Sequence, residues 1–157
     1  MNFNNFTIKS QEAVQQAIQL VQSRGQQVIE PEHLLAGVLK VGENVTNFIF
    51  QKLGMNGQQV ALVLDRQIAS LPKVTGGEPY LSRGANEMLQ KAVEYSKGLG
   101  DEYVSLEAML LAILNVKGNA STILKDAGMD AMGMDYSSGM VELARRENPD
   151  IPFQQGD

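Results

Sequence analysis

The sequence contains no cysteine and no tryptophan, and its 157 residues include a single histidine, His33. The absence of cysteine excludes disulfides, thiolate metal ligands and cysteine nucleophiles, and it is compatible with a reducing compartment. His33 has no second histidine nearby, so it cannot build a standard zinc site, and it has no serine or acidic partner at the spacing of a catalytic triad. We therefore interpret His33 as a structural residue and expect no metal site and no catalytic residues.

Positive charge is also scarce. The chain carries 13 lysines and arginines against 18 acidic residues, a formal net charge of -5, and the basic residues form no stripe. Affinity for nucleic acids rests mainly on clustered lysine and arginine, so we expect no nucleic-acid partner. Mild acidity is otherwise ordinary for a cytosolic protein, and the charge alone identifies no partner.

Long hydrophobic runs and nucleotide-binding motifs are missing as well. The longest apolar stretches, such as residues 109–114, are far shorter than the roughly 20 residues that cross a bilayer. Residues 1–6 lack the basic and apolar segments of a secretory signal. The pattern G-x-x-x-x-G-K-[ST] of a Walker A loop does not occur. We expect a cytoplasmic chain that contacts no membrane, binds no cofactor and is no enzyme by itself.

The sequence does contain an internal duplication. Shifting the chain by 75 residues lays residues 7–39 over 82–114 without a gap, with seven identities in 33 positions where ordinary composition gives about two. Apolar positions keep the same phase, as in the pairs Val14/Leu89 and Ile29/Val104. Both copies are therefore expected to bury the same helical faces.

Capping residues divide the first copy into helices. Thr7 can cap a helix that Gly25 ends, and Pro31 suits the first turn of a second helix, where its missing N–H costs nothing. Two further helices are predicted over 45–53 and 58–71.

The second copy repeats this order, with Ser82 and Ser105 as caps and Gly100 and Gly128 as stops. Proline and glycine make residues 73–80 a linker between the copies. The predicted fold class is an all-α, pseudo-twofold helical bundle with about four helices in each repeat. A groove lined by both halves, where the two copies meet, is the expected binding place.

Several ordered segments in both copies are specific enough to suggest a family. FTIKSQEAVQQA, VIEPEHLL, GDEYVSLEAMLLAIL and ILKDAGMD resemble the duplicated Clp N-terminal domain, with ClpB-type members nearest. The resemblance implies a double Clp repeat over residues 1–130, with repeat one at 6–72 and repeat two at 81–130. It also implies a module of a AAA+ disaggregase that recognises unfolded or aggregated polypeptide or an adaptor protein.

The resemblance carries a set of substrate-binding residues onto this sequence. By motif these are Thr7, Asp101 and Glu107, together with the apolar position Leu89; an exposed apolar residue of the family corresponds to the smaller Ala108. Each has a structural alternative. Thr7 can serve only as a cap, Asp101 and Glu107 can complement helix dipoles, and Leu89 can belong to the core.

Residues 131–157 do not continue the Clp pattern. Residues 133–157 resemble a short interior piece of a class I S-adenosylmethionine-dependent methyltransferase, in which Asp135 and Asp157 would lie near the cofactor. The glycine-rich loop is missing, so no cofactor pocket is expected. Alternatively, Ser137 or Ser138 caps a substitute last helix containing Met140, Val141 and Leu143, and residues 148–157 are disordered.

Three functions remain open from the sequence. The first is a binding module for unfolded polypeptide that acts in cis on an attached AAA+ Clp ring. The second is a free-standing adaptor that docks on a separate ring in trans. The third is an enzyme fragment that uses the methyltransferase-like tail.

Overall fold

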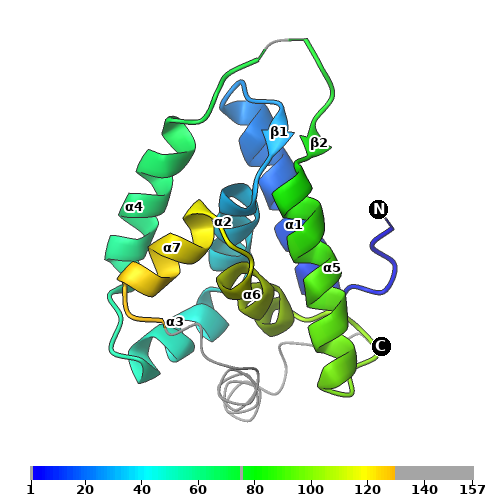
Figure 1. Ribbon diagram of the computed structural model, residues 1–157, viewed down its shortest axis with the longest axis vertical. Coiled ribbons are helices and arrows are strands. Elements are labelled where there is room, and N and C mark those ends of the chain that lie inside the picture. The colour runs from blue at the N-terminus through cyan, green and yellow to red at the C-terminus, as the bar shows by residue number, and fades with distance from the viewer. Residues whose placement is uncertain (1, 75, 130–157) are drawn as a thin grey trace.

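The computed structural model describes residues 2–74 and 76–129, which form a bundle of helices with two very short strands (Figure 1). In chain order the elements are α1 (Ile8–Ser23), β1 (Val28–Ile29), α2 (Pro31–Val41), α3 (Glu43–Lys52), α4 (Gly57–Ala69), β2 (Tyr80–Leu81), α5 (Arg83–Gly98), α6 (Leu106–Asn115) and α7 (Asn119–Asp126). The predicted all-α class is confirmed.

The predicted caps set the helix starts. Thr7, Ser82 and Ser105 have extended backbone, and their side-chain oxygens accept hydrogen bonds from the backbone N–H groups three residues later. These bonds satisfy donors that a helix leaves open in its first turn. Gly25 and Gly100 follow α1 and α5 with φ of 68° and 78°, a left-handed conformation that favours glycine.

The bounds of α3 and α4 differ from the prediction by one or two residues at each end. Helix α3 begins at Glu43 instead of residue 45, because Gly42 ends α2 and caps α3 at one sharp corner, and its N–H donates to the Val38 carbonyl. Helix α4 ends at Ala69 instead of residue 71. The strands were not predicted, because two residues are too few to show an alternating pattern.

Backbone pairing joins the two repeats crosswise. Ile29 pairs with Leu81 in the parallel β1–β2 sheet, and Phe6 pairs with Val104 in an isolated parallel bridge. Adding the repeat shift of 75 to Phe6 and Ile29 gives Leu81 and Val104, so the two pairings are equivalent under the duplication. The start of each repeat is therefore paired with the segment before the second helix of the other repeat.

Helix α2 lies at the centre of the bundle and contacts each of the other described helices (Figure 1). Its side chains Leu34, Leu35 and Val38 are fully buried. Helix α1 packs most extensively on α2, because Gly37 presents no side chain and lets the Ala13 backbone approach closely. In the second repeat the first helix, α5, likewise packs on the second, α6.

Within the described ranges no helix is long and apolar enough to cross a membrane. The same part of the chain holds no cluster of three or more histidine or acidic side chains that could bind a metal ion. The predicted tail, with Asp135, Asp157 and the substitute helix after Ser137 or Ser138, lies outside the described residues.

Candidate functional site

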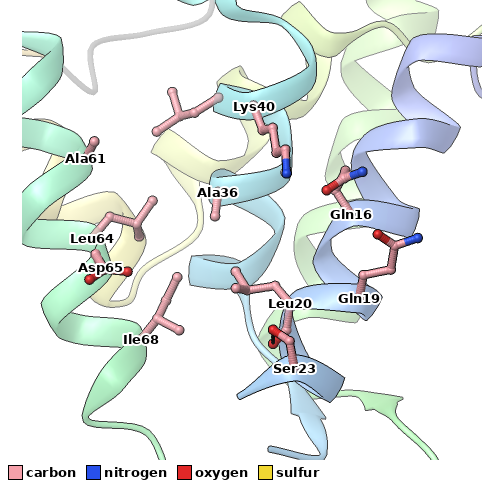
Figure 2. A pocket seen from close by; sticks show the side chains of 12 residues that line it. Gln16, Gln19, Leu20, Ser23, Ala36, Lys40, Ala61, Leu64, Asp65 and Ile68 are labelled. Atoms are coloured by element: carbon pink, nitrogen blue, oxygen red, sulfur yellow. Dashed lines mark hydrogen bonds between the residues drawn. The ribbon is translucent and has the colours of Figure 1, made fainter. Parts of the chain in front are cut away.

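The main candidate site is a groove between α1 and α4, which we call the α1–α4 groove (Figure 2). Its cavity volume is about 520 Å³, within the range of small-ligand and peptide pockets. Three helices line it: α1 contributes Gln16, Gln19, Leu20 and Ser23, α2 contributes Ala36, Gly37, Leu39 and Lys40, and α4 contributes Ala61, Leu64, Asp65 and Ile68.

The two walls of the groove differ in chemistry. On the α4 side the lining is mainly apolar, with Leu64 and Ile68 facing the groove (Figure 2). On the α1 side Gln16 and Gln19 present amide groups. The floor on α2 contains Ala36 and Gly37; the small side chain of Ala36 leaves the groove its depth, whereas the space beside Gly37 is filled by the Ala13 backbone.

Two charged residues line the groove. Asp65 on α4 forms an ion pair with Arg24, which follows α1, so this pair connects the two walls near Ser23. Lys40 on α2 is exposed and forms no ion pair with another described residue. An ion pair therefore bridges the two walls at the Arg24 end of the groove, and a lysine with no ion pair to a described residue lies at the Lys40 end.

A buried hydrogen-bond chain holds the helices that form the groove. The Glu30 backbone N–H donates to His33 Nδ1 (2.9 Å), and His33 Nε2 lies 2.8 Å from Gln26 Oε1. The Gln26 amide nitrogen donates in turn to the Ile68 carbonyl (2.7 Å). The chain connects the start of α2 to the end of α4 and fixes one wall relative to the floor.

The geometry determines the protonation of His33. Because Nδ1 accepts the Glu30 N–H, the ring proton must sit on Nε2, which then donates to Gln26. Burial, with a smaller contribution from the Arg24 charge, lowers the pKa of His33 to about 4. His33 is neutral at physiological pH, which agrees with the structural role expected from the sequence.

A second cavity of about 590 Å³ continues the groove toward α3. The two cavities share Leu39 and Ala61, and Phe50 and Met55 also line the second one. The accessible trough therefore follows α4 along most of its length.

The structure places three of the predicted binding residues around one bridge. The Thr7 backbone N–H donates to the Val104 carbonyl (3.0 Å), and Asp101 and Glu107 lie three residues before and after Val104. Thr7 and Glu107 are buried, and Asp101 is half-buried. Leu89 is fully buried in the α5 core stripe.

These positions fit the structural alternatives for the four residues. The Thr7 hydroxyl accepts from the Ser10 N–H (3.1 Å), as a cap does, and Glu107 lies in the first turn of α6. A buried side chain reaches a partner only if the surrounding backbone moves. Their role in binding stays a prediction.

The α1–α4 groove differs from the predicted cleft, because all its lining residues belong to repeat one and not to both halves. The sequence pattern missed it for a physical reason. Periodicity identifies the apolar stripe that faces the core, whereas a groove depends on which neighbouring helices fail to meet. The available signal was the apolar character of Leu20 and Leu39 beside the main stripe.

One buried carboxyl joins the two repeats directly. Asn119 Nδ2, at the start of α7, donates to Glu32 Oε2 (3.4 Å) near the start of α2. Burial is the main cause that raises the pKa of Glu32. The contact gives Glu32 a structural function at the junction between the repeats.

The model of the Clp repeat (R) N-terminal domain matches residues 5–127. The chain belongs to this family. The duplication and the crosswise bridges of this chain lie within the matched residues.

Two curated relatives of this Clp repeat domain are ClpB chaperones. The chaperone protein ClpB of Bacteroides thetaiotaomicron is 79% identical over 129 residues, which cover 82% of this chain and 15% of that protein. The ClpB of Porphyromonas gingivalis is 53% identical over 148 residues, covering 94% of this chain and 17% of the relative. The chain therefore spans less than a fifth of the length of these two relatives.

Solved structures share the fold of this Clp repeat domain at low sequence identity. The N-terminal domain of the Candida albicans Hsp104 has a TM-score of 0.74 at 20% identity and covers 92% of each chain. A complex of a ClpV N-domain with a VipB peptide has a TM-score of 0.74 at 18% identity, covering 92% of this chain and 89% of that one. At this identity the likeness concerns the fold.

Proposed function

We propose that this chain is the substrate- or adaptor-binding N-terminal module of a ClpB-like AAA+ disaggregase in the cytoplasm, and that it recognises unfolded or aggregated polypeptide. ATP hydrolysis would belong to ring domains in other parts of such a protein. The relatives that support this proposal are ClpB chaperones.

The observation that carries the proposal is the α1–α4 groove, an open trough with an apolar wall and a polar rim. Unfolded chains differ from folded ones in their exposed apolar side chains, and such a wall can cover these. The ClpV N-domain, which shares the fold, has been solved with a bound peptide. Because the contact is small, we expect micromolar or weaker affinity.

The test fills the groove from an exposed position. In Ala61→Arg a long side chain projects from α4 into the trough, and arginine is a good helix former, so the fold is retained. We expect affinity for a fluorescently labelled, permanently unfolded protein, measured by anisotropy, to fall at least about tenfold, roughly 1.4 kcal/mol.

Ala69→Arg is the matched control, because Ala69 is exposed on the same helix but does not line the groove. It should bind like the parent chain. Equal binding by both variants would remove the groove from the proposal, and no binding by the parent chain would reject the proposal itself. In the same titration, unchanged affinity of a Thr7→Ala, Asp101→Asn, Glu107→Gln triple variant would exclude those residues from binding; Leu89 is tested as Leu89→Met.

The alternative is a free-standing adaptor that docks on a separate Clp ATPase. The gene sequence downstream of Asp157 and co-purification with a AAA+ subunit distinguish the two arrangements. Both use the same polypeptide-binding surface.

A further inference from the structure

The glutamines of α1 fall into two groups. The side chain of Gln11 donates to the carbonyls of Phe3 (3.1 Å) and Phe6 (3.0 Å), and so fastens the N-terminal segment. Gln16 and Gln19 line the groove, and their side chains form no hydrogen bond with any residue in the described part of the chain. Their amides are available to an occupant of the groove.

The requirements of a bound polypeptide depend on its conformation. A helix satisfies its own backbone N–H and C=O groups, so it needs only an apolar surface. An extended chain loses water from these groups when it enters a trough, and each unpaired group is costly. Each glutamine amide offers both a donor and an acceptor, which is what an extended backbone requires.

The remaining surfaces of the groove suit the side chains of an extended segment. Successive side chains of such a segment point in opposite directions, so every second one can enter the trough. The small side chain of Ala36 leaves space at the floor. Leu20 and Leu39 are the partly exposed apolar side chains of the lining, and the buried Leu64 and Ile68 lie behind the surface on the α4 side. Small or medium apolar side chains at alternate positions fit this arrangement.

Charge fixes the direction in which the segment lies. Asp65 is neutralised by Arg24 at one end, while Lys40 at the other end extends between α2 and the glutamine wall (Figure 2). Of the two charged side chains that line the groove, Asp65 is therefore paired, and Lys40 carries a positive charge that forms no ion pair with another described residue. An acidic side chain or a C-terminal carboxylate is expected beside Lys40.

We propose that the α1–α4 groove binds extended polypeptide that has apolar side chains at alternate positions and an acidic group at the Lys40 end, with Gln16 and Gln19 hydrogen-bonded to its backbone. The inference rests on the proposed function and specifies its substrate. Because backbone groups are common to all sequences, this contact explains how one groove can accept many unfolded clients.

The first test removes the amides. In Gln16→Ala/Gln19→Ala both substitutions favour the helix, so α1 stays folded. Loss of about two hydrogen bonds should weaken binding of the unfolded protein about tenfold. The matched control is Gln15→Ala/Gln22→Ala, which removes two exposed glutamines of α1 that do not line the groove; it should bind like the parent chain.

The second test changes the ligand. The probe is a synthetic peptide in which leucine alternates with serine and the last residue is glutamate. Two versions are N-methylated on either set of alternate residues, so each loses the N–H groups along one edge. We expect one version to bind clearly more weakly than the other, because only one edge faces the glutamine wall.

A third test addresses the contact between Lys40 and the acidic group of the peptide. Lys40→Met should weaken the glutamate peptide about two- to fivefold, in the range of an exposed ion pair, and leave the glutamine version of the peptide unchanged. Equal loss for both peptides would overturn the assigned direction.

Three outcomes overturn the extended-chain inference: unchanged binding by the Gln16/Gln19 variant, equal binding by the two methylated peptides, or tighter binding of a stapled helical peptide of the same composition. If these occur while Ala61→Arg still weakens binding at least about tenfold, the proposed function survives and the inference fails. If the unmodified chain binds no unfolded protein, both fail.

Discussion

His33 shows how much one side chain can determine without touching a ligand. Its ring connects the Glu30 N–H to Gln26, and Gln26 connects to the Ile68 carbonyl at the end of α4. The sequence correctly indicated a structural histidine, because it lacked partners for chemistry. Nothing in the sequence indicated that Gln26 is the partner of His33, because its contacts depend on how the turn after α1 is placed relative to α4.

The buried imidazole predicts a direct measurement. The chain has one histidine, so its NMR resonance needs no assignment, and we expect it to titrate with a pKa of about 4. Between pH 6.5 and about 4 the unfolded chain binds a proton there that the folded chain does not. The free energy of unfolding should therefore fall as pH is lowered through this window, by about 3 kcal/mol in total.

Glu32 makes the resonance a better measurement than the stability curve. Burial raises the pKa of its carboxyl group, so its contribution to stability changes with pH in the opposite direction. A His33 pKa near 6.5 in the folded chain would show that the imidazole is solvated and that the hydrogen-bond chain beneath the groove is absent.

At the scale of helices, the capping residues were predictable from the sequence, whereas the packing of neighbouring helices against one another was not. Thr7, Ser82 and Ser105 cap helices as predicted, because a cap depends only on the residues next to it. The α1–α4 groove escaped prediction because it depends on the separation of two helices that both lie on α2. That separation depends in turn on how closely α1 packs against α2.

Gly37 determines how closely α1 can approach α2. A Cβ atom placed on Gly37 would overlap the backbone carbonyl of Ala13, so Gly37→Ala must push α1 away from α2. We expect a loss of about 1–3 kcal/mol in the free energy of unfolding, measured with urea, although alanine is the better helix former.

Gly84→Ala in α5 is the matched control, because its Cβ would lie 3.6 Å from Pro31 Cγ, an ordinary contact. It should leave stability unchanged or raise it by up to about 1 kcal/mol. If Gly37→Ala also stabilised the chain, close approach of α1 and α2 would not be what sets the groove.

For the whole molecule, the duplication was predictable and its crosswise connection was not. The shift of 75 residues follows from the sequence, but the pairs Phe6–Val104 and Ile29–Leu81 each join one repeat to the other. The Asn119–Glu32 hydrogen bond adds a third connection, and α2 of repeat one contacts every described helix of repeat two. The buried apolar residues of the two repeats form one common core cluster.

Interlocked repeats should unfold together. The chain has no tryptophan, so one can be introduced as a probe in each repeat: Phe48→Trp in α3 and Tyr95→Trp in α5, both at half-buried positions. In each variant we expect a single urea transition, with the same midpoint by tryptophan fluorescence and by circular dichroism. A fluorescence transition in one repeat that precedes loss of helix signal would show that the repeats unfold separately. The central position of α2 predicts the opposite, because disruption of either repeat exposes the same buried Leu34, Leu35 and Val38.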